Sequence, residues 1–241
     1  MAQTPTHFGG GAFPTTRWTV VLKAKGSGPD EPGCRVALET LVQSYWQPLY
    51  FYVRRRHVAA DAEDLTQTFF ATLLEKDYLQ TVERDKGRFR AFLLVALKHF
   101  LSNEYDKARA QKRGGGKKML SLDFDSAERA YAFEPSTDET PERIYLRSWA
   151  RALTAQAMAR LAEESKEKGK AELFESLKEH LAGGDGYRAL AEKFEMSEAN
   201  LKVTVHRLRR RFAAILRELV RDTVASEAEV DGELKEILEA L

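Results

Sequence analysis

Two stretches of the chain concentrate the residue types that bind phosphate. Residues 84–118 hold eleven Lys or Arg against three Asp or Glu, and residues 197–221 hold seven against two. The net charge of the 241 residues is only +1, partly because residues 226–241 carry six acids and one Lys. Clustered Lys and Arg bind polyanions. The chemistry that the two blocks favour is therefore two separate contacts with a polyanion.

The second basic block follows the pattern of a helix-turn-helix. Leu190 and Phe194 share one helix face, Ala191 is small enough to admit a second helix, Met196 fills the turn, and Ser197 can cap the second helix. Such a helix enters a major groove by its N-terminal turn. The candidate residues for duplex DNA are Ser197, Asn200, Lys202, Val203, His206, Arg207 and Arg210. The alternative is an ordinary amphipathic hairpin with a solvated basic face.

The first basic block mixes aromatic and basic side chains along the helical stretch 89–110. Single-stranded nucleic acid is bound by stacking of bases on aromatic rings and by Lys and Arg along the phosphates, so this block suits strand opening. The candidate residues are Arg88, Arg90, Phe92, Lys98, His99, Asn103, Lys107 and Arg109. The alternative is that Phe89, Phe92 and Phe100 are ordinary core residues.

An acidic helix start precedes this block. Asp61 is expected to cap a helix over 61–79, and acids in its first turn favour the positive end of the helix dipole. Residues three apart lie close to one face, where a partner helix could dock. The candidate partner-binding residues are Asp61, Asp64, Gln67 and Phe70.

The elements that position these residues are all predicted to be helical. Apolar residues recur at helical spacing and no convincing alternating strand is present, which predicts an all-α fold. The expected helices cover 36–55, 61–79, 89–110, 141–164, 171–181, 187–194 and 197–221.

Breakers in the sequence predict two small helical domains joined by a flexible linker, with the helix-turn-helix in the second. Three glycines at 114–116 end the first helical block, and Pro141 after Thr140 suits the start of the next. The expected divisions are an N-terminal arm over 1–35, a first domain over 36–113, a linker over 114–140, a second domain over 141–222 and an acidic tail over 223–241.

Several classes of protein lack support in the sequence. The single cysteine, Cys34, excludes an intramolecular disulfide framework and a cysteine cluster for zinc. No Gly-rich phosphate loop, metal cluster or nucleophile motif is present, so we expect no enzyme activity, no cofactor and no metal. No apolar run is long enough to span a membrane, and no signal peptide is recognisable, which leads us to expect a cytoplasmic protein.

The motifs in this order resemble the extracytoplasmic-function sigma factors of the sigma-70 family, the subunits that direct RNA polymerase to promoters. The resemblance covers 41–113 and 187–217 and depends on Asp-Ala-Glu-Asp-Leu at 61–65, Phe-Arg-Ala-Phe-Leu at 89–93 and the helix-turn-helix. It implies that 36–113 is sigma domain 2 and that 141–222 is sigma domain 4. It also implies a protein that binds core RNA polymerase and starts transcription at specific promoters.

The resemblance implies a role for each candidate set. Asp64, Gln67 and Phe70 would meet the β′ clamp helices of polymerase. Residues 92–109 would melt and bind the minus-ten element, and residues 197–211 would bind the minus-thirty-five element while the β flap grips the apolar side of the second domain. The linker would thread the polymerase channel, to which its acids would be suited. These acids are Asp123, Asp125, Glu128, Glu134, Asp138 and Glu139.

The chain departs from the family pattern at several places. Phe92, His99 and Asn103 stand where the family commonly has Trp, Asn and Asp, which predicts an unusual base in the non-template pocket. Residues 161–181 carry a Lys- and Glu-rich insert, and the tail beyond Arg221 is additional. Regulation therefore has two alternatives, a separate anti-sigma factor as is usual in the family or intramolecular inhibition by the C-terminal tail.

The tail has the pattern of an amphipathic helix. An apolar stripe can dock on a partner surface, and the acids opposite would then compete with DNA phosphates, so intramolecular inhibition is one interpretation. The other is a helix that only completes the small second core. The stripe comprises Val230, Leu234, Ile237, Leu238 and Leu241, and the acids are Glu229, Asp231, Glu233, Glu236 and Glu239.

A competing function for the whole chain is a two-domain helix-turn-helix transcriptional regulator that never joins polymerase. A regulator needs a sensor pocket or a dimer seam in its first domain. Residues 41–113 instead offer an acidic helix start and a basic aromatic helix. Binding to core polymerase separates the two functions.

Overall fold

The computed structural model describes residues 32–75, 87–110, 122–132, 139–184 and 186–241. Regular structure in these ranges is helical and includes no strand, so the all-α prediction is confirmed. The elements are α2 (Pro32–Arg54), α3 (Ala59–Glu75), α4 (Phe89–Ala110), α5 (Phe124–Tyr131), α6 (Pro141–Glu167), α7 (Ala171–Leu177), the 3₁₀ turn η3 (Lys178–Leu181), α8 (Tyr187–Lys193), α9 (Glu198–Arg221), the 3₁₀ turn η4 (Glu227–Glu229) and α10 (Val230–Ala240).

The first group of helices, α2, α3 and α4, encloses an aromatic-rich core. Tyr45 and Leu49 of α2 lie four residues apart on its inner face, and both are fully buried. Leu93 and Leu97 do the same on α4, and Phe89 meets Tyr45 edge to face at 5.5 Å between ring centroids. This core holds α4 in place, so the outer side of α4 is presented on a rigid element.

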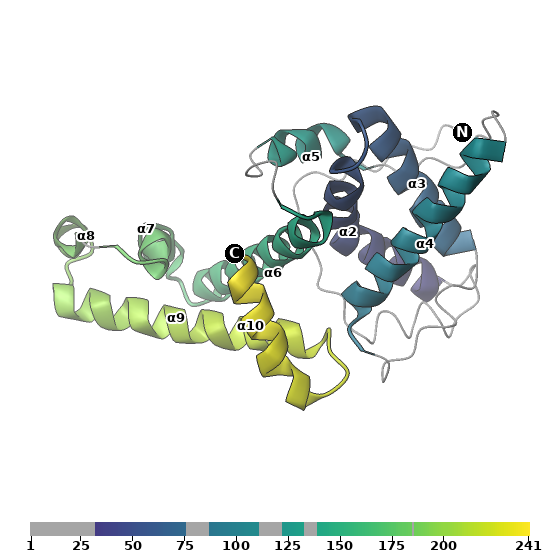
Figure 1. Ribbon diagram of the computed structural model, residues 1–241. Coiled ribbons are helices and arrows are strands. Elements are labelled where there is room, and N and C mark those ends of the chain that lie inside the picture. Colours follow the sequence, from purple (N-terminus) through teal and green to yellow (C-terminus); the bar gives the residue numbers. More distant parts are fainter. Residues whose placement is uncertain (1–31, 76–86, 111–121, 133–138, 185) are drawn as a thin grey trace, which may run out of the picture.

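Helix α6 connects this group to the rest of the molecule. Thr140 caps it by accepting a hydrogen bond from the Arg143 amide (3.3 Å), and Pro141 occupies its first turn, as predicted. Its 27 residues span about 40 Å. Figure 1 shows α6 running from α2 at one end to α7 at the other. Near its N-terminus Trp149 packs in the same core as α2, and near its C-terminus Leu161 packs in the core with Phe174 of α7.

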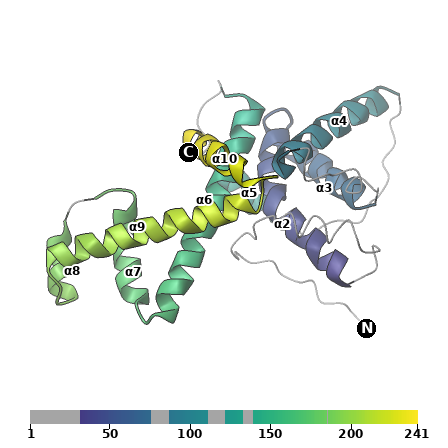
Figure 2. The same ribbon diagram turned by 90° about the horizontal axis from the view of Figure 1, so that it is seen from below.

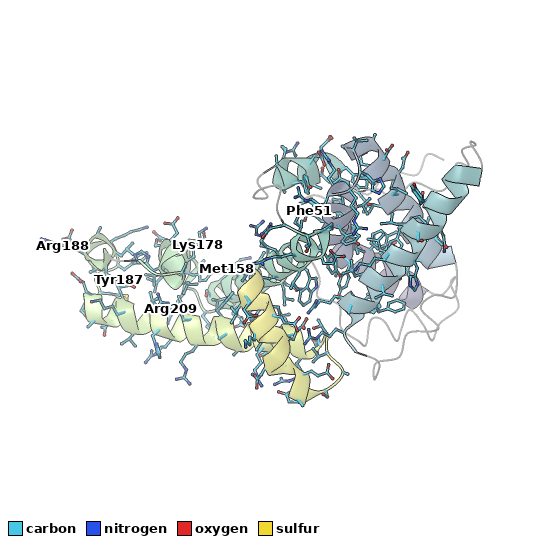
Figure 3. All side chains as sticks on the ribbon, in the orientation of Figure 1. Phe51, Met158, Lys178, Tyr187, Arg188 and Arg209 are labelled. Atoms are coloured by element: carbon cyan, nitrogen blue, oxygen red, sulfur yellow. The ribbon has the colours of Figure 1, made fainter. Side chains whose placement is uncertain are left out.

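The second group, α7, α8 and the first half of α9, forms a smaller core around Leu177, Tyr187, Leu201 and Val205. Figure 2 shows α9 extending from α8 back toward α2 and α4. In Figure 3 Tyr187 and Arg209 lie at this end of the molecule, Phe51 lies in the first group of helices, and Met158 lies between them.

The core does not break at the expected boundary at residue 141. One continuous set of buried residues includes α2, α3, α4, the whole length of α6, the second half of α9 and α10. The two helical groups therefore share α6 and α9 as common walls. The expected division into two domains stays a prediction, and the described residues show that the two groups are in contact through these helices.

The predicted linker contains a docked helix. Within 114–140 the structure describes 122–132 and 139–140, and α5 packs against α2 there. Phe124 lies 5.4 Å from Trp46 and 5.1 Å from Tyr50 between ring centroids, and Glu128 accepts hydrogen bonds from Tyr50 (2.5 Å) and Arg54 (2.8 Å). Residues 122–132 of the expected linker are therefore helical or near-helical and packed against α2, and the linker as a whole stays a prediction. Glu134 and Asp138 lie outside the described residues.

Two other linker acids also have internal partners. Asp123 caps α5 by accepting a hydrogen bond from the Ser126 amide at 3.0 Å. Glu139 pairs with Arg147 of α6 at 2.5 Å. Glu139 therefore joins this part of the chain to α6, whereas the Asp123 bond is local to α5 and Asp123 and Asp125 are exposed.

Candidate nucleic-acid interface

Helices α8 and α9 are joined by a turn with the local contacts that the sequence predicts. Ser197 caps α9 by accepting a hydrogen bond from the Asn200 amide (3.2 Å), and the Met196 amide donates to the Ala191 carbonyl (3.0 Å) across the turn. Met196 packs against the small core as expected. The turn also places Glu195 at φ 51°, in the left-handed region that few non-glycine residues adopt.

The outer face of α9 is basic and open. Lys202, His206, Arg207 and Arg210 are exposed, and Val203 is 47% exposed among them. Within the described residues no carboxylate pairs with Arg207 or Arg210. These cations can therefore meet phosphates without first losing an internal partner.

Two arginines of the same helix have structural roles instead. Arg209 donates to the carbonyls of Leu181 (3.1 Å) and His180 (2.7 Å), which fixes α9 against η3. Arg211 forms a bidentate pair with Glu164 of α6 at 2.6 and 2.8 Å. Hydrogen bonds from Arg211 lower the pKa of Glu164. The spacing of residues in the sequence does not reveal the contact of Arg209 with the carbonyls of η3.

A pocket of about 270 Å³ opens beside α9, between α6 and α7. Its lining combines apolar side chains with several basic ones and one acid, Glu164. The residues that shape it include Leu161, Lys168, Leu173, Phe174, Arg207 and Leu208.

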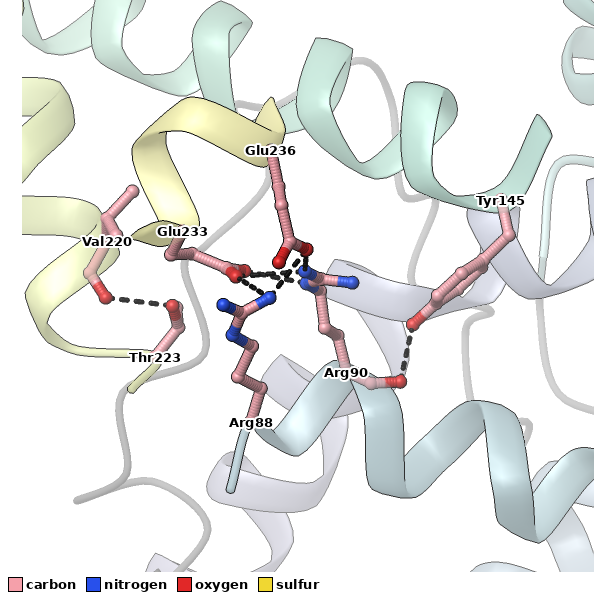
Figure 4. Close-up of polar contacts among 7 residues, drawn as sticks. All are labelled: Arg88, Arg90, Tyr145, Val220, Thr223, Glu233 and Glu236. Atoms are coloured by element: carbon pink, nitrogen blue, oxygen red, sulfur yellow. Dashed lines mark hydrogen bonds and ion pairs between the residues drawn. The ribbon is translucent and has the colours of Figure 1, made fainter. Parts of the chain in front are cut away.

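The start of α4 does not present its arginines to solvent. Arg88 contacts Glu233 (2.7 Å) and Glu236 (2.5 Å) of α10, and Arg90 contacts the same two carboxylates at 2.6 and 2.7 Å. Figure 4 shows the four side chains meeting between the two helices. Arg90 also lies over the Trp149 ring at 5.1 Å. Burial acts to lower the pKa of Arg90, but its hydrogen bonds to Glu233 and Glu236 and the negative charge of Glu233 together outweigh burial and raise it.

The rest of α4 separates into inner and outer residues. Phe100 is 8% exposed and meets Phe69 edge to face, and Phe92 is half-buried and stacked on Phe89, so these rings follow the core alternative. Exposed residues farther along α4 are His99 and Asn103. The side chains of Lys107 and Arg109 lie outside the described residues.

Lys98 is an outer residue of α4 with an internal partner. It pairs with Glu142 of α6 at 2.7 Å, and its ammonium group lies 5.9 Å from the Tyr52 ring centroid. Its side chain is still 42% exposed. A phosphate would therefore have to compete with Glu142 for Lys98.

The expected docking face on α3 is only partly exposed. Asp61 and Asp64 are exposed and Gln67 is half-buried, but Phe70 is 1% exposed and packs against Phe69. Phe70 therefore belongs to the core. At 3.6 residues per turn, two successive steps of three move about 120° around a helix, so Asp64 and Phe70 cannot share a face. Asp61 also lies within the first turn and is not the cap, because α3 begins at Ala59.

Sequence reasoning missed the role of Glu233. This residue was assigned to the polar side of the tail, yet it is fully buried between Val230 and Ile237. The spacing held a signal, because Glu233 follows Val230 by three residues and precedes Ile237 by four, so all three share one face. A carboxylate in the middle of an apolar stripe indicates a cationic partner.

Two further classes of site were sought in the described ranges. No group of three or more His, Cys, Asp or Glu side chains there could hold a metal ion. None of the helices there is long and apolar enough to cross a membrane.

Comparisons with protein-family models, with curated proteins and with solved structures gave no match to this chain.

Proposed function

We propose that this protein is a sigma factor that binds core RNA polymerase and directs promoter-specific initiation of transcription. The observation that carries the proposal is the exposed basic face of α9 in a capped helix-turn-helix, placed in one chain after the α3 and α4 motifs. The resemblance of those motifs to the extracytoplasmic-function sigma factors supplies the link to polymerase. An enzymatic activity is not part of the proposal.

The proposal gives α9 the role of reading duplex DNA at the minus-thirty-five element. A helix of this kind enters the major groove by its N-terminal turn, and here that turn is capped by Ser197. Lys202, Val203 and His206 would then face bases or the groove wall, and Arg207 and Arg210 would lie nearer the phosphates. Their exposure supports this assignment.

The proposal gives α4 the role of binding the minus-ten element. Lys98, His99 and Asn103 lie on its exposed side, which supports a contact with an opened strand. Arg88, directly before α4, and Arg90, in its first turn, are paired with α10. These two arginines could bind DNA only after their ion pairs with α10 are broken.

Two surfaces are proposed for polymerase itself. Asp61 and Asp64 on the exposed side of α3, with Gln67 at its edge, would meet the β′ clamp helices. The pocket between α6, α7 and α9 includes the apolar side chains Leu161, Leu173, Phe174 and Leu208, which would suit the β flap. Phe70 is left out of the first surface because it is buried.

Run-off transcription tests the proposal. Purified protein is added to core RNA polymerase with the DNA found upstream of its own gene, and transcript start sites are mapped. We expect a discrete transcript that depends on the protein, together with retention of core polymerase on the tagged protein. Absence of both, with a protein that is folded and binds DNA, would show that it is not a sigma factor.

The second candidate is a helix-turn-helix regulator that acts apart from polymerase. The burial of Phe70 and the pairing of Arg88 and Arg90 favour it, because both observations reduce the surface that α3 and α4 offer to polymerase and DNA. The same pull-down with core polymerase separates the two candidates.

A further inference from the structure

The C-terminal helix α10 is joined to α4 by a compact cluster of opposite charges. Glu233 and Glu236 supply the carboxylates, and Arg88 and Arg90 supply the guanidinium groups, with contacts of 2.5 to 2.7 Å. Figure 4 shows that the cluster fills the space between the two helices. Both cations are members of the set that the sequence assigns to nucleic acid. Two carboxylates of the same chain therefore hold the positions that phosphates would take.

The cluster is anchored by buried apolar contacts. Val230 and Ile237 are fully buried on the same face of α10 as Glu233, which is itself fully buried. A buried charge that loses its partner is strongly destabilising, so Glu233 fixes Arg90 in this position. Glu236 differs, because its side chain is 44% exposed. The cluster thus has a buried side at Glu233 and an open side at Glu236.

The other end of the tail is attached to α9. Glu227 pairs with Arg221 at 2.5 Å and with Arg217 at 3.5 Å, and Asp231 also pairs with Arg217. These side chains are between 38% and 78% exposed, so each pair contributes little alone. Together with the cluster at α4 they make the tail a bridge between the two helices that are proposed to bind DNA.

We propose that α10 is an acidic latch, which in the free protein covers the arginines at the start of α4 and weakens binding of single-stranded DNA. The latch rests on the proposed nucleic-acid role of α4. Release of Glu236 leaves Arg88 with Glu233 as its one partner in the cluster, and frees Arg88 to meet a strand before Arg90, because the side chain of Arg88 is 24% exposed and that of Arg90 is 11% exposed. DNA phosphates and the two carboxylates compete for the same guanidinium groups.

The sharpest test replaces the exposed carboxylate of the cluster. Glu236→Gln removes one charge and leaves Glu233 and the apolar face of α10 intact, whereas truncation of the tail would also remove Val230 and Ile237 from the core. The matched control is Glu239→Gln, which alters an exposed acid of the same helix that pairs with Lys235. Binding of a fluorescein-labelled, mixed-sequence single-stranded oligonucleotide is measured by anisotropy at low salt, and thermal unfolding is followed by circular dichroism.

We expect Glu236→Gln to tighten binding by about fivefold, the factor that corresponds to loss of one partly exposed ion pair. Glu239→Gln is expected to bind as the wild type does. Adding Arg88→Ala to Glu236→Gln should remove the gain, because the freed cation is the one that binds the strand. If Glu236→Gln stays folded and binds no more tightly than the control, the latch is wrong and α10 is only structural.

A second variant covers the case in which Glu236→Gln does not fold. Glu227→Gln weakens the exposed attachment to Arg221 and leaves the cluster at α4 in place. A smaller gain in binding is expected, and its absence would equally overturn the latch.

Run-off transcription separates this inference from the proposed function. A wild-type protein that supports transcription while neither Glu236→Gln nor Glu227→Gln gains affinity would leave the sigma-factor proposal standing and remove the latch. A gain in binding without any transcription or polymerase binding would support the latch and overturn the sigma-factor proposal.

Discussion

At the scale of single residues, the structure depends on charged side chains with specific internal partners. Arg211 binds Glu164 through two hydrogen bonds and fixes α9 to α6. Arg209 reaches two carbonyls and fixes α9 to η3. Neighbouring Arg207 and Arg210 have no such partner in the described residues. The difference separates the arginines that hold the helix from those that are free to bind a ligand.

The cap of α9 provides a direct test at this scale. Ser197→Ala removes the oxygen that accepts the Asn200 amide, and an N-cap of this kind contributes about 1 kcal/mol. We expect the free energy of unfolding to fall by about that amount in urea denaturation. Ser197→Asp keeps an acceptor at the cap and serves as the control. Equal losses in both variants would show that the hydrogen bond does not contribute.

The pair of Glu139 and Arg147 predicts a pH dependence. Hydrogen bonds from Arg147 hold the pKa of Glu139 below its ordinary value of 4.5. A carboxyl whose pKa is lower in the folded state adds stability that is present above the unfolded value and is lost as the pH falls through the folded value. We expect Glu139→Gln to destabilise the protein at neutral pH, and the difference from wild type to shrink below pH 4.5.

Urea denaturation at a series of pH values checks this expectation. Arg147→Met serves as the matched variant, because it removes the same pair from the other side and should abolish the same part of the pH dependence. The double variant, with both Glu139→Gln and Arg147→Met, should lose no more of this pH dependence than either single variant. A free energy of unfolding that changes with pH in the same way in wild type and in Glu139→Gln would contradict the stabilising role given to the pair of Glu139 and Arg147.

At the scale of elements, α9 combines a structural half and a reading half. Its second half is buried at Ile215, Leu219 and Val220, while its first half presents Lys202 and Arg207 outward. A helix fixed at one end positions the side chains at its other end without a flexible loop. This arrangement suits recognition that depends on register in a groove.

Substitutions on the reading half test this division. Lys202→Ala and Arg207→Ala should both weaken binding to duplex promoter DNA. A lost phosphate contact should weaken all sequences alike and lower the salt slope by about one, whereas a lost base contact should cost about 1–3 kcal/mol and relax one position. Lys166→Ala removes an exposed cation of α6 and is the control. Unchanged affinity in both test variants would show that this face of α9 does not bind duplex DNA.

Helix α3 offers a separate test of polymerase binding. Asp64 is exposed, so Asp64→Lys reverses a surface charge without disturbing the core. We expect retention of core polymerase to fall by about tenfold, since like charges placed across an interface are costly. Glu163→Lys makes the same reversal at an exposed site on α6. Similar retention by the two variants would show that α3 is not the docking face.

The elements also show what spacing can and cannot predict. The long helices follow from apolar residues three and four apart, and the caps at Thr140 and Ser197 were correctly placed because their side chains act locally. Helix α5 was missed because its eight residues sit in a polar stretch, although Phe124, Ala127 and Tyr131 have helical spacing. Its partner Trp46 lies far away in sequence. Contacts of this kind have no local signal.

The candidate sites show the same difference between features with a local signal and contacts between distant segments. The exposed face of α9 could be predicted, because inner and outer residues alternate regularly along one helix. The pairing of Arg88 and Arg90 with Glu233 could not, because it joins segments more than 140 residues apart. The burial of Phe70 was obscured for a simpler reason, since steps of three residues drift around the helix.

At the scale of the whole molecule, α6 and α10 convert two helical groups into one packed unit. Both helices contribute to the core that begins at Leu41 of α2 and ends at Ile237 of α10. A protein built from independent domains would bury these surfaces separately. The shared core therefore implies coupled unfolding of the two groups.

This coupling gives the last prediction. Trp46 and Trp149 are buried in the core of α2 and α6, so tryptophan fluorescence includes a report on that core, whereas far-ultraviolet circular dichroism follows all helices. We expect the two signals to change together in a single urea transition.

Ile237→Ala should shift that whole transition by about 2–5 kcal/mol, because it empties a fully buried site where α10 joins the core. Leu238→Ala, at a position 63% exposed, should change stability by no more than about 0.5 kcal/mol. Two separate transitions, of which only the circular dichroism one moves in Ile237→Ala, would mean that the groups unfold independently and that α10 does not connect them.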